Sequence, residues 1–286
     1  MEKRNEQGQT LEEFLAAYDA NRYRNPSNTV DMVLMTVSEG KLKLLLIKRK
    51  NHPFIGDWAL PGGFIDFEED MEKAVMRELE EETNITDHTY FRQLYTFGNA
   101  DRDPRTRIIT TAYLSLTPED NIRQTKAQDD AADAAWFSIS KEVIRLDGGT
   151  RESRLSIVSE EKNSHMIYLV TDEAQHNYMV TKSEILPESN CRLAADHIKA
   201  VNMAVDLVQN RAASTGILFN LLPDECTLRE IQNVYEAVTG HKTDTGNFRR
   251  DIKKMLKATG NQKMVKGKPA ALYSFNPMYQ YLEENL

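Results

Sequence analysis

Three glutamates, Glu78, Glu81 and Glu82, occupy positions i, i+3 and i+4 of a segment that follows a Gly-Gly pair. On an α-helix this spacing places the three carboxylates on one flank. Carboxylate oxygens are the ligands that hard divalent cations prefer. Residues 66–82 contain nine acidic and two basic side chains, an excess of negative charge that is costly unless a positive group lies close by. The spacing therefore predicts a cation-binding helix.

An exposed acidic helix face is the alternative interpretation of this charge run. Helical angles favour the cation site, because Met71, Ala74 and Val75 form an apolar stripe that Glu78 and Glu82 continue. A helix that only faced the core would have Leu or Ile at those two positions. A half-buried carboxylate without a partner is costly, and a bound metal ion would remove that cost.

The wider pattern resembles the Nudix box, with the residues Gly63-x5-Glu69-x7-Arg77-Glu78-Leu79-x-Glu81-Glu82-x-Asn84-Ile85. The family has Gly where this chain has Asn84, and Asn is the next-best residue for the left-handed backbone that ends a helix. The resemblance implies a hydrolase that depends on a divalent cation and acts on nucleoside diphosphates linked to another moiety.

The resemblance also implies roles for single residues. Glu78, Glu81 and Glu82 would ligate Mg²⁺ or Mn²⁺ together with the carbonyl of Gly62, and an ion pair of Glu69 with Arg77 would fix the loop against the helix. Metal ions neutralise charge on the phosphates and lower the pKa of bound water. Glu78 is the candidate general base, although some members of the family have their base on a distant loop.

A second charged segment, Asp101–Arg107, lies between two predicted strands. A salt-bridged turn around Pro104 is one interpretation. The stretch from Tyr95 to Ile108 also resembles a loop of Nudix proteins that handle ADP-ribose, which implies phosphate contacts from Arg49, Arg105 and Arg107. Trp58 and Phe97 are either base-stacking residues or core aromatics, and their sequence positions leave both open.

The elements around these residues predict a mixed α/β fold, a Nudix-type mixed sheet sandwiched by helices. Apolar, branched runs at 29–37 and 42–47 predict a β-hairpin. Further strands are expected at 90–98 and 108–116, a short helix at 11–18, and a small β-meander at 147–187 appended to the first domain. The apolar spacing at 193–209 predicts a long linker helix.

Residues 216–286 predict a winged helix-turn-helix domain. Thr227 and Glu230 form a capping-box pattern that opens a helix, which Gly240 ends. A second, basic helix is expected at 246–257. A hairpin at 264–275 follows, with its tip at Lys266-Gly267-Lys268.

This C-terminal region is basic in an acidic chain. Residues 241–268 have nine Lys or Arg and two Asp, whereas the whole chain has a net charge of −8. Such a positive island indicates binding to double-stranded DNA; a solvated basic helix without a partner is the alternative. Asn247 could read adenine or cap the helix. The candidate DNA contacts are Asn247, Arg249, Arg250, Lys253, Lys254, Lys266 and Lys268.

Together the two halves resemble the Nudix-related transcriptional regulators, known for control of NAD metabolism and, in some branches, sugar use. The resemblance implies either hydrolysis of ADP-ribose or a similar nucleoside diphosphate derivative, or sensing of such an effector with little turnover. A bifunctional homodimer is the central expectation. The expected domains are an N-terminal lead and short helix (1–25), a Nudix domain (26–190), a linker helix (191–215) and the winged helix domain (216–286).

Composition limits the remaining classes. No run of 18 apolar residues predicts a membrane span, and the N-terminus has no hydrophobic signal core. Cys191 and Cys226 are too far apart in sequence for a metal-binding or redox motif. These features are typical of a cytoplasmic protein.

Overall fold

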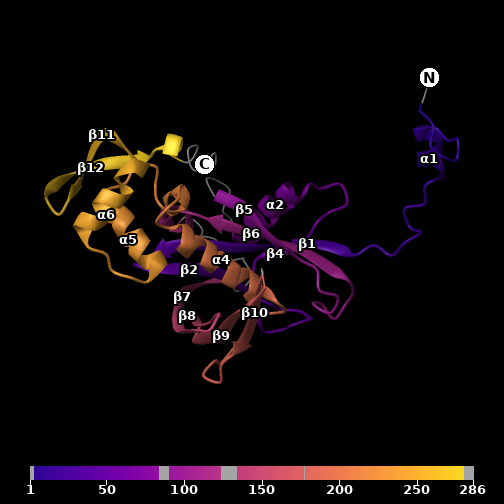
Figure 1. The fold of residues 1–286 in the computed structure, drawn as a ribbon, viewed down its shortest axis with the longest axis horizontal. Coiled ribbons are helices and arrows are strands. Elements are labelled where there is room, and N and C mark those ends of the chain that lie inside the picture. The colour runs from indigo at the N-terminus through magenta and orange to yellow at the C-terminus, as the bar shows by residue number, and fades with distance from the viewer. Residues whose placement is uncertain (1–2, 84–89, 124–133, 177, 280–286) are drawn as a thin grey trace.

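The computed structural model describes residues 3–83, 90–123, 134–176 and 178–279. Its centre is a mixed sheet whose strands run in the order β10-β9-β8-β7-β2-β1-β6-β5, with β3 paired to β2 and β4 paired to β1 (Figure 1). β1 and β6 are parallel, and the other pairs are antiparallel. The strand bounds are β1 Ser27–Ser38, β2 Lys41–Lys48, β3 Trp58–Ala59, β4 Gly62–Phe64, β5 Tyr90–Phe97, β6 Ile108–Leu116, β7 Ala134–Asp147, β8 Thr150–Ser159, β9 Ser164–Gln175 and β10 Tyr178–Ile185.

The predicted hairpin near the start of the chain is confirmed. β1 and β2 pair with Ser38 opposite Lys41. The two residues between them, Glu39 and Gly40, have φ values of 54° and 69°, as a tight two-residue turn requires. The strands predicted at 90–98 and 108–116 correspond to β5 and β6.

Helices cover both faces of the sheet, which confirms the predicted α/β sandwich. On one face, α2 (Met71–Thr83) and α3 (Glu119–Arg123) share an apolar cluster with alternate residues of β1, such as Val30 and Met32. The residues between them in β1, such as Val33 and Met35, face the other side. There they belong to the cluster that includes α4 (His197–Arg211). Successive side chains of β1 thus point to opposite faces of the sheet and pack against a different helical layer on each face.

The predicted meander forms part of the main sheet. β7 pairs with β2 through residues 134–138 and with β8 through residues 138–147, so β8, β9 and β10 extend the same sheet. A buried ionic network ties this extension to α4, because Lys141 of β7 contacts Asp206 of α4 at 2.6 Å. Arg151 of β8 bridges Asp206 and Asp172. The predicted meander is thus present as β8, β9 and β10, and it continues the main sheet through β7.

The helix predicted from residue 193 begins at His197. The preceding residues are held in an extended path, since the Trp58 nitrogen donates to the carbonyl of Arg192 and the Ala194 nitrogen donates to the carbonyl of Trp58. Ala195 then has a φ of 46°, a turn that precedes the helix. Ala200, Val201, Ala204, Val205 and Val208 of α4 are buried, so this helix is a packed element of the fold.

The C-terminal region has the helices and wing that the sequence predicts. Its elements are η2 (Gly216–Leu221), α5 (Leu228–Thr239), α6 (Thr245–Ile252), η3 (Lys253–Met255), β11 (Leu256–Val265) and β12 (Lys268–Phe275). Thr227 and Glu230 form both bonds of the capping box, and Gly240 ends α5 with a φ of 75°. The hairpin turn lies at Lys266 and Gly267.

The second helix is shorter than predicted. It ends at Ile252, one 3₁₀ turn follows, and Leu256 already pairs with Phe275 in the hairpin. The apolar spacing is satisfied because Phe248, Ile252 and Met255 are all buried. Among the described helices, none is long and apolar enough to span a membrane.

The N-terminal helix α1 (Leu11–Ala17) lies apart from this body, at the end of an arm that projects beyond β1 (Figure 1). Thr10 and Glu13 form a complete capping box at its start. All of its residues are exposed, including Leu11, Phe14 and Leu15.

Candidate functional site

Helix α2 is positioned by its apolar face. Ala74, Val75 and Leu79 are buried against β1, which directs Glu78 and Glu82 toward strand β4. Met71, expected in the same stripe, is 43 % exposed. It is the first residue of the helix, next to the largely exposed segment that enters it, so the stripe begins one turn later than predicted.

Arg77 holds the loop before α2 against the helix. Its Nε and Nη2 donate to the two carboxylate oxygens of Glu69, each at 2.9 Å, and Nη2 also donates to the Phe64 carbonyl at 3.0 Å. These hydrogen bonds lower the pKa of Glu69, as a paired guanidinium does. The ion pair that the Nudix resemblance implied is present.

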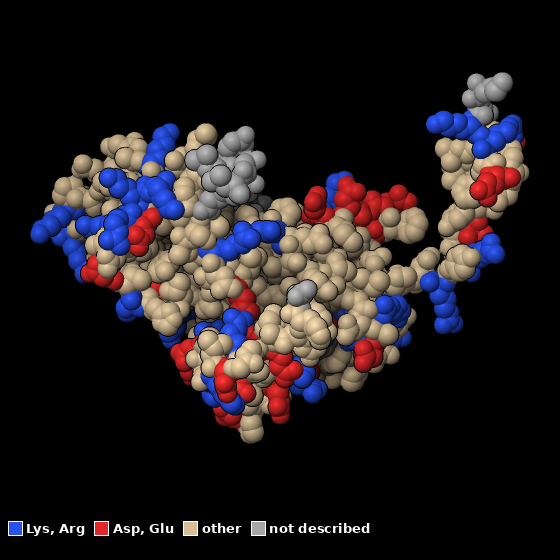
Figure 2. Space-filling model, in the orientation of Figure 1, with Lys and Arg blue, Asp and Glu red and all other residues tan. Residues whose placement is uncertain are grey.

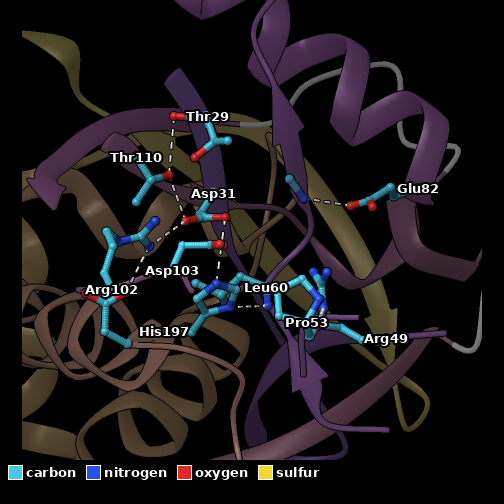
Figure 3. A network of polar contacts seen from close by, with 12 residues as sticks. Thr29, Asp31, Arg49, Pro53, Leu60, Glu82, Arg102, Asp103, Thr110 and His197 are labelled. Carbon is cyan, nitrogen blue, oxygen red and sulfur yellow. Dashed lines mark hydrogen bonds and ion pairs between the residues drawn. The ribbon is translucent and has the colours of Figure 1, made fainter. Parts of the chain in front are cut away.

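The three glutamates share one flank of α2 and differ in environment. Glu78 is buried, and its Oε1 accepts a 2.7 Å hydrogen bond from Arg77 Nη1. Glu81 is 60 % exposed in its side chain and lies 3.4 Å from the same nitrogen. Glu82 turns toward β4, where it accepts from the backbone nitrogen of Gly62 at 2.8 Å (Figure 3).

Glu82 carries the clearest electrostatic signal of the site. Burial raises its pKa to about 8; the Gly62 hydrogen bond opposes this rise, and the charges of Glu78, Asp31 and Glu81 add to it. Each of these neighbours is an acid, so a cation among the carboxylates would relieve a real electrostatic cost. The donor set of hard oxygens suits Mg²⁺ or Mn²⁺.

The three carboxylates do not have the arrangement of a complete metal-binding site. Within the described ranges, no group of three His, Cys, Asp or Glu side chains is arranged to hold a metal ion. Arg77 explains this arrangement, because it holds both Glu78 and Glu81. The residues therefore fit a cation in chemistry and burial, and would take it up by exchanging Arg77 for the metal.

The Gly-Gly pair lies where side chains have no room. A Cβ on Gly62 would stand 2.1 Å from the Val30 carbonyl oxygen, and its φ is 150°. A Cβ on Gly63 would stand 2.2 Å from Oε1 of Glu78. The two glycines thus let β4 approach both β1 and the acidic helix closely.

Replacing Gly62 with Ala should destabilise the fold by about 3 kcal/mol or more, because the conflict is with backbone atoms and the conformation is strained. Urea unfolding of the full chain measures the change. Gly56→Ala is the matched control, since Gly56 also has a positive φ but its Cβ would have nothing within 4 Å among the described atoms. Equal costs for both substitutions would show that the close approach to Val30 is unimportant.

A cluster of largely buried polar side chains adjoins this pair (Figure 3). Asp31 of β1 pairs with Gly62 in the sheet register and accepts a 2.7 Å hydrogen bond from Thr110. Arg102, from the loop between β5 and β6, lies 2.8 Å from Asp196 and 3.8 Å from Asp31. His197 completes the cluster, with Nδ1 accepting from the Leu60 nitrogen at 3.0 Å.

The basic surface lies away from this cluster, at the end of the molecule formed by the C-terminal domain. Figure 2 shows Lys and Arg side chains gathered over α6, β11 and β12, and acidic side chains gathered over α2. The predicted DNA contacts are all exposed: Asn247, Arg249, Arg250, Lys253, Lys254, Lys266 and Lys268. Arg249 and Arg250 lie on α6, and Lys253 and Lys254 lie on η3. Lys266 lies in the hairpin turn, and Lys268 begins β12.

Asn247 does not cap the helix. Asp244 is the capping residue of α6 and accepts a hydrogen bond from the Asn247 nitrogen. The amide side chain of Asn247 is therefore exposed near the start of α6. Lys242 and Lys263 are paired with Glu236 and Glu230 of α5, so part of the counted positive charge is neutralised within the domain.

Comparison with known proteins agrees with both halves of this geometry. The NUDIX domain family matches residues 26–156, and the NrtR DNA-binding winged helix domain matches residues 218–275. Over 266 residues the chain is 30 % identical to the "ADPR responsive transcriptional repressor NtrR" of Acinetobacter baylyi, which covers 92 % of this chain and 87 % of that protein. This chain belongs to the NrtR-type family of Nudix proteins.

Three further relatives define the likeness. An "ADP-ribose pyrophosphatase" of Methanocaldococcus jannaschii is 39 % identical over 125 residues, 43 % of this chain and 69 % of that protein. A MutT/nudix family protein from Enterococcus faecalis superposes with a TM-score of 0.70 at 28 % identity, over 95 % of each chain. Shewanella oneidensis NrtR, crystallised with a 27mer DNA, gives 0.62 at 28 % identity, over 88 % of this chain and 95 % of that one.

The three arginines predicted to contact phosphates are dispersed around the Nudix site. Arg105 is bound to Asp103 by two hydrogen bonds and lies 5.6 Å above the Phe64 ring, beside the loop that Arg77 holds. Arg49 donates to the Pro53 carbonyl (Figure 3). Arg107 is exposed immediately before β6.

Two residues that the sequence left open lie in the core. Trp58 is buried against Phe137, with ring centroids 4.8 Å apart, and Phe97 is buried beside Tyr95. Their interpretation as base-stacking residues is not supported. Asn84 and Ile85, the last positions of the Nudix box, lie outside the described residues.

Arg102, Asp31 and His197 belong to the site, although the sequence did not identify them as site residues. The segment that contains Arg102 was singled out by its charges and by the resemblance, and His197 lies in the predicted linker helix. Only the fold shows that Arg102 is the buried arginine of its loop and that it reaches the start of α4.

Proposed function

We propose that this protein is a Nudix pyrophosphohydrolase of ADP-ribose, or of a related nucleoside diphosphate derivative, that is also a DNA-binding transcriptional regulator. The observation that carries the enzymatic half is the half-buried Glu82, whose carboxylate lies among other acids beside Gly62. Such a site has negative charge to hold a cation and a backbone that approaches it closely. The "ADP-ribose pyrophosphatase" relative supports the substrate class.

Glu78, Glu81 and Glu82 would hold Mg²⁺ or Mn²⁺, with the Gly62 carbonyl as a further ligand. The bound metal would supply charge neutralisation on the phosphates and an acidified water. Glu69 and Arg77 position the loop and the helix. Glu78 remains our candidate base, and Arg49, Arg105 and Arg107 are the candidate phosphate contacts.

The test of the enzymatic half is direct. Full-length protein with Mg²⁺ should convert ADP-ribose to AMP and ribose 5-phosphate, and chelation of the metal should stop the reaction. Absence of turnover on ADP-ribose and on a panel of nucleoside diphosphate derivatives would refute the hydrolase and leave the second candidate.

That second candidate is a regulator whose Nudix domain binds ADP-ribose with little hydrolysis. The contacts of Arg77 with Glu78 and Glu81 favour this candidate, because the positive guanidinium lies among the proposed metal ligands in place of a metal ion. The full-length likeness to a repressor favours it as well. Measurable binding without turnover would support this candidate alone.

The regulatory half requires double-stranded DNA as a partner and the cytoplasm, where a bacterial chromosome lies, as the site of action. The exposed lysines and arginines of α6, η3 and the β11–β12 turn are the proposed contacts with phosphate and bases. For domain organisation we propose the units 26–190, 191–215 and 216–286, preceded by the N-terminal arm of residues 1–25.

We also propose a homodimer, since regulators with this domain bind paired half-sites. The N-terminal arm supports it. Leu11, Phe14, Leu15 and Tyr18 form an apolar stripe at i, i+3, i+4 and i+7, and each is exposed. A helix of seven residues is marginal without packing, so a second copy of the chain is the partner we propose for this stripe.

Changing Leu11 and Leu15 together to Glu should raise the dimer dissociation constant at least about tenfold, because two buried leucines contribute about 1.5–3 kcal/mol each. Analytical ultracentrifugation measures the constant. Ala16→Glu with Ala17→Glu is the matched control, since it adds the same charge on the polar side of α1. Equal effects of both pairs would contradict a contact through the stripe.

A further inference from the structure

The start of helix α4 contains a buried polar cluster that capping and packing do not explain. Asp196 stands at the N-cap position of α4, yet its side chain forms no capping hydrogen bond with the described residues. A capping side chain contributes about 1 kcal/mol to the stability of a helix, and Asp196 does not make this contribution. Its Oδ1 instead accepts a 2.8 Å hydrogen bond from Arg102.

Arg102 is a charged residue of a surface loop whose side chain extends into the protein. It belongs to the segment between β5 and β6, and its side chain is 6 % exposed. Its Nε has no hydrogen-bond partner in the described part of the chain. Buried ion pairs with unmet donors stabilise a fold poorly, so this contact is better suited to setting a position than to holding the fold together.

His197 ties the same helix to the Gly-Gly strand. Its Nδ1 accepts the Leu60 backbone N–H at 3.0 Å, and its Nε2 lies 3.9 Å from Oδ1 of Asp31. Burial lowers the pKa of this imidazole, which agrees with an unprotonated Nδ1 that accepts a hydrogen bond. Leu60 is two residues before Gly62, the donor to Glu82.

The cluster is therefore adjacent to the candidate ligand site. Asp31 pairs with Gly62 across β1 and β4, and its charge contributes to the raised pKa of Glu82. Figure 3 shows Asp31 in contact with both Arg102 and His197, with Glu82 farther away on the helix side. Two independent links, one through Leu60 and one through Arg102, reach the first turn of α4.

The other end of α4 reaches the DNA-binding domain. Val201, Val205 and Val208 share one apolar cluster with Ile231 and Val238 of α5. Gln209 also donates to the Val238 carbonyl at 3.1 Å. A change in the position of α4 must therefore pass to α5, which packs against the basic helix α6 through Tyr235 and Phe248.

We propose that Asp196 and His197 are positioning residues that couple ligand occupancy of the Nudix site to DNA affinity. A ligand that shifts the 101–107 loop or the segment from Leu60 to Gly62, which leads into β4, shifts the first turn of α4 with it, and α4 moves α5. This inference rests on the proposed function, because it requires that one chain bind both a nucleoside diphosphate derivative and DNA.

The experiment measures the affinity of the full-length protein for a duplex from its own gene's neighbourhood, with and without excess ADP-ribose. Coupling of two sites typically changes affinity about 5- to 150-fold, and the reciprocal change in ADP-ribose affinity must have the same size. The unmodified protein should show at least about a fivefold change.

Three variants test the cluster. In His197→Leu the acceptor for Leu60 is removed, whereas His197→Asn keeps an oxygen near the position of Nδ1. In Asp196→Asn the charge that holds Arg102 is removed and the volume is kept. Met203→Ala, at an exposed position of the same helix, is the control.

In His197→Leu and Asp196→Asn we expect ADP-ribose to change the DNA affinity by less than about twofold. Each variant should still bind ADP-ribose alone and DNA alone. His197→Asn and Met203→Ala should retain the coupling. If His197→Leu fails to fold, Asp196→Asn decides. Coupling that survives in Asp196→Asn or in folded His197→Leu overturns the inference. If ADP-ribose does not change the DNA affinity of the unmodified protein, the regulatory function on which the inference rests is refuted.

Discussion

Glu82→Gln should lower the hydrolysis of ADP-ribose by about 100-fold or more, the loss expected when a ligand of a catalytic metal is removed. The glutamine keeps the size of the side chain and an oxygen that can accept from Gly62. It removes the charge that burial makes costly, so the free energy of unfolding should not fall. Release of AMP from ADP-ribose with Mg²⁺ measures the rate.

Glu80→Gln is the matched control, because it makes the same change two residues earlier at an exposed position of α2. Its rate should remain close to that of the unmodified protein. Calorimetry with Mg²⁺ alone provides a second measurement, in which Glu82→Gln should weaken uptake of the ion. If Glu82→Gln retains full activity, or if both variants lose activity equally, the assignment of Glu82 as a cation ligand is wrong.

Arg249→Ala combined with Lys253→Ala should weaken duplex binding by about 10- to 100-fold at low salt, because both side chains are exposed on the face that bears α6 and η3. Each phosphate contact contributes about one unit to the slope of log affinity against log salt. The slope should therefore become shallower by about two. Fluorescence anisotropy at several salt concentrations measures both quantities.

The control removes the same charge elsewhere. Lys41 and Lys50 are exposed on the Nudix half of the chain, and changing both to Ala should leave the slope unchanged. A fall of similar size in the control would indicate attraction by overall charge. An unchanged slope in the Arg249 and Lys253 variant would exclude this face from contact with DNA.

Local chemistry determined the features that sequence alone could predict. The capping box at Thr227, the left-handed Gly240 and the Ser38–Lys41 turn depend on neighbours a few residues away, and each is present in the structure. The acidic flank of α2 was predictable for the same reason, since three residues within one helical turn and a half share a face.

Features that depend on distant neighbours were predicted less well. Helix α4 starts late because Trp58, more than 130 residues earlier, holds residues 192–194 in an extended path. The basic helix ends early because Leu256 pairs with Phe275. Periodicity could not reveal either constraint, nor could it show that Arg102 is the arginine of its loop that reaches Asp196.

The local environment of the glutamates could not be predicted from spacing either. The pattern places Glu78, Glu81 and Glu82 on one flank, but only packing separates a buried Glu78 from an exposed Glu81. The contact of Arg77 with both of them depends on the loop that Glu69 anchors.

The apolar cluster that includes α4 limits how this molecule can respond to a signal. It runs without a break from Leu44 and Leu114 of the central sheet to Val234 and Ile252 of the winged helix domain. A close-packed interior of this kind resists opening and tolerates small sliding of one helix over another. The DNA-binding domain is therefore packed against the Nudix domain and does not move independently of it. We expect an allosteric change in this protein to be a shear motion of a few packed helices.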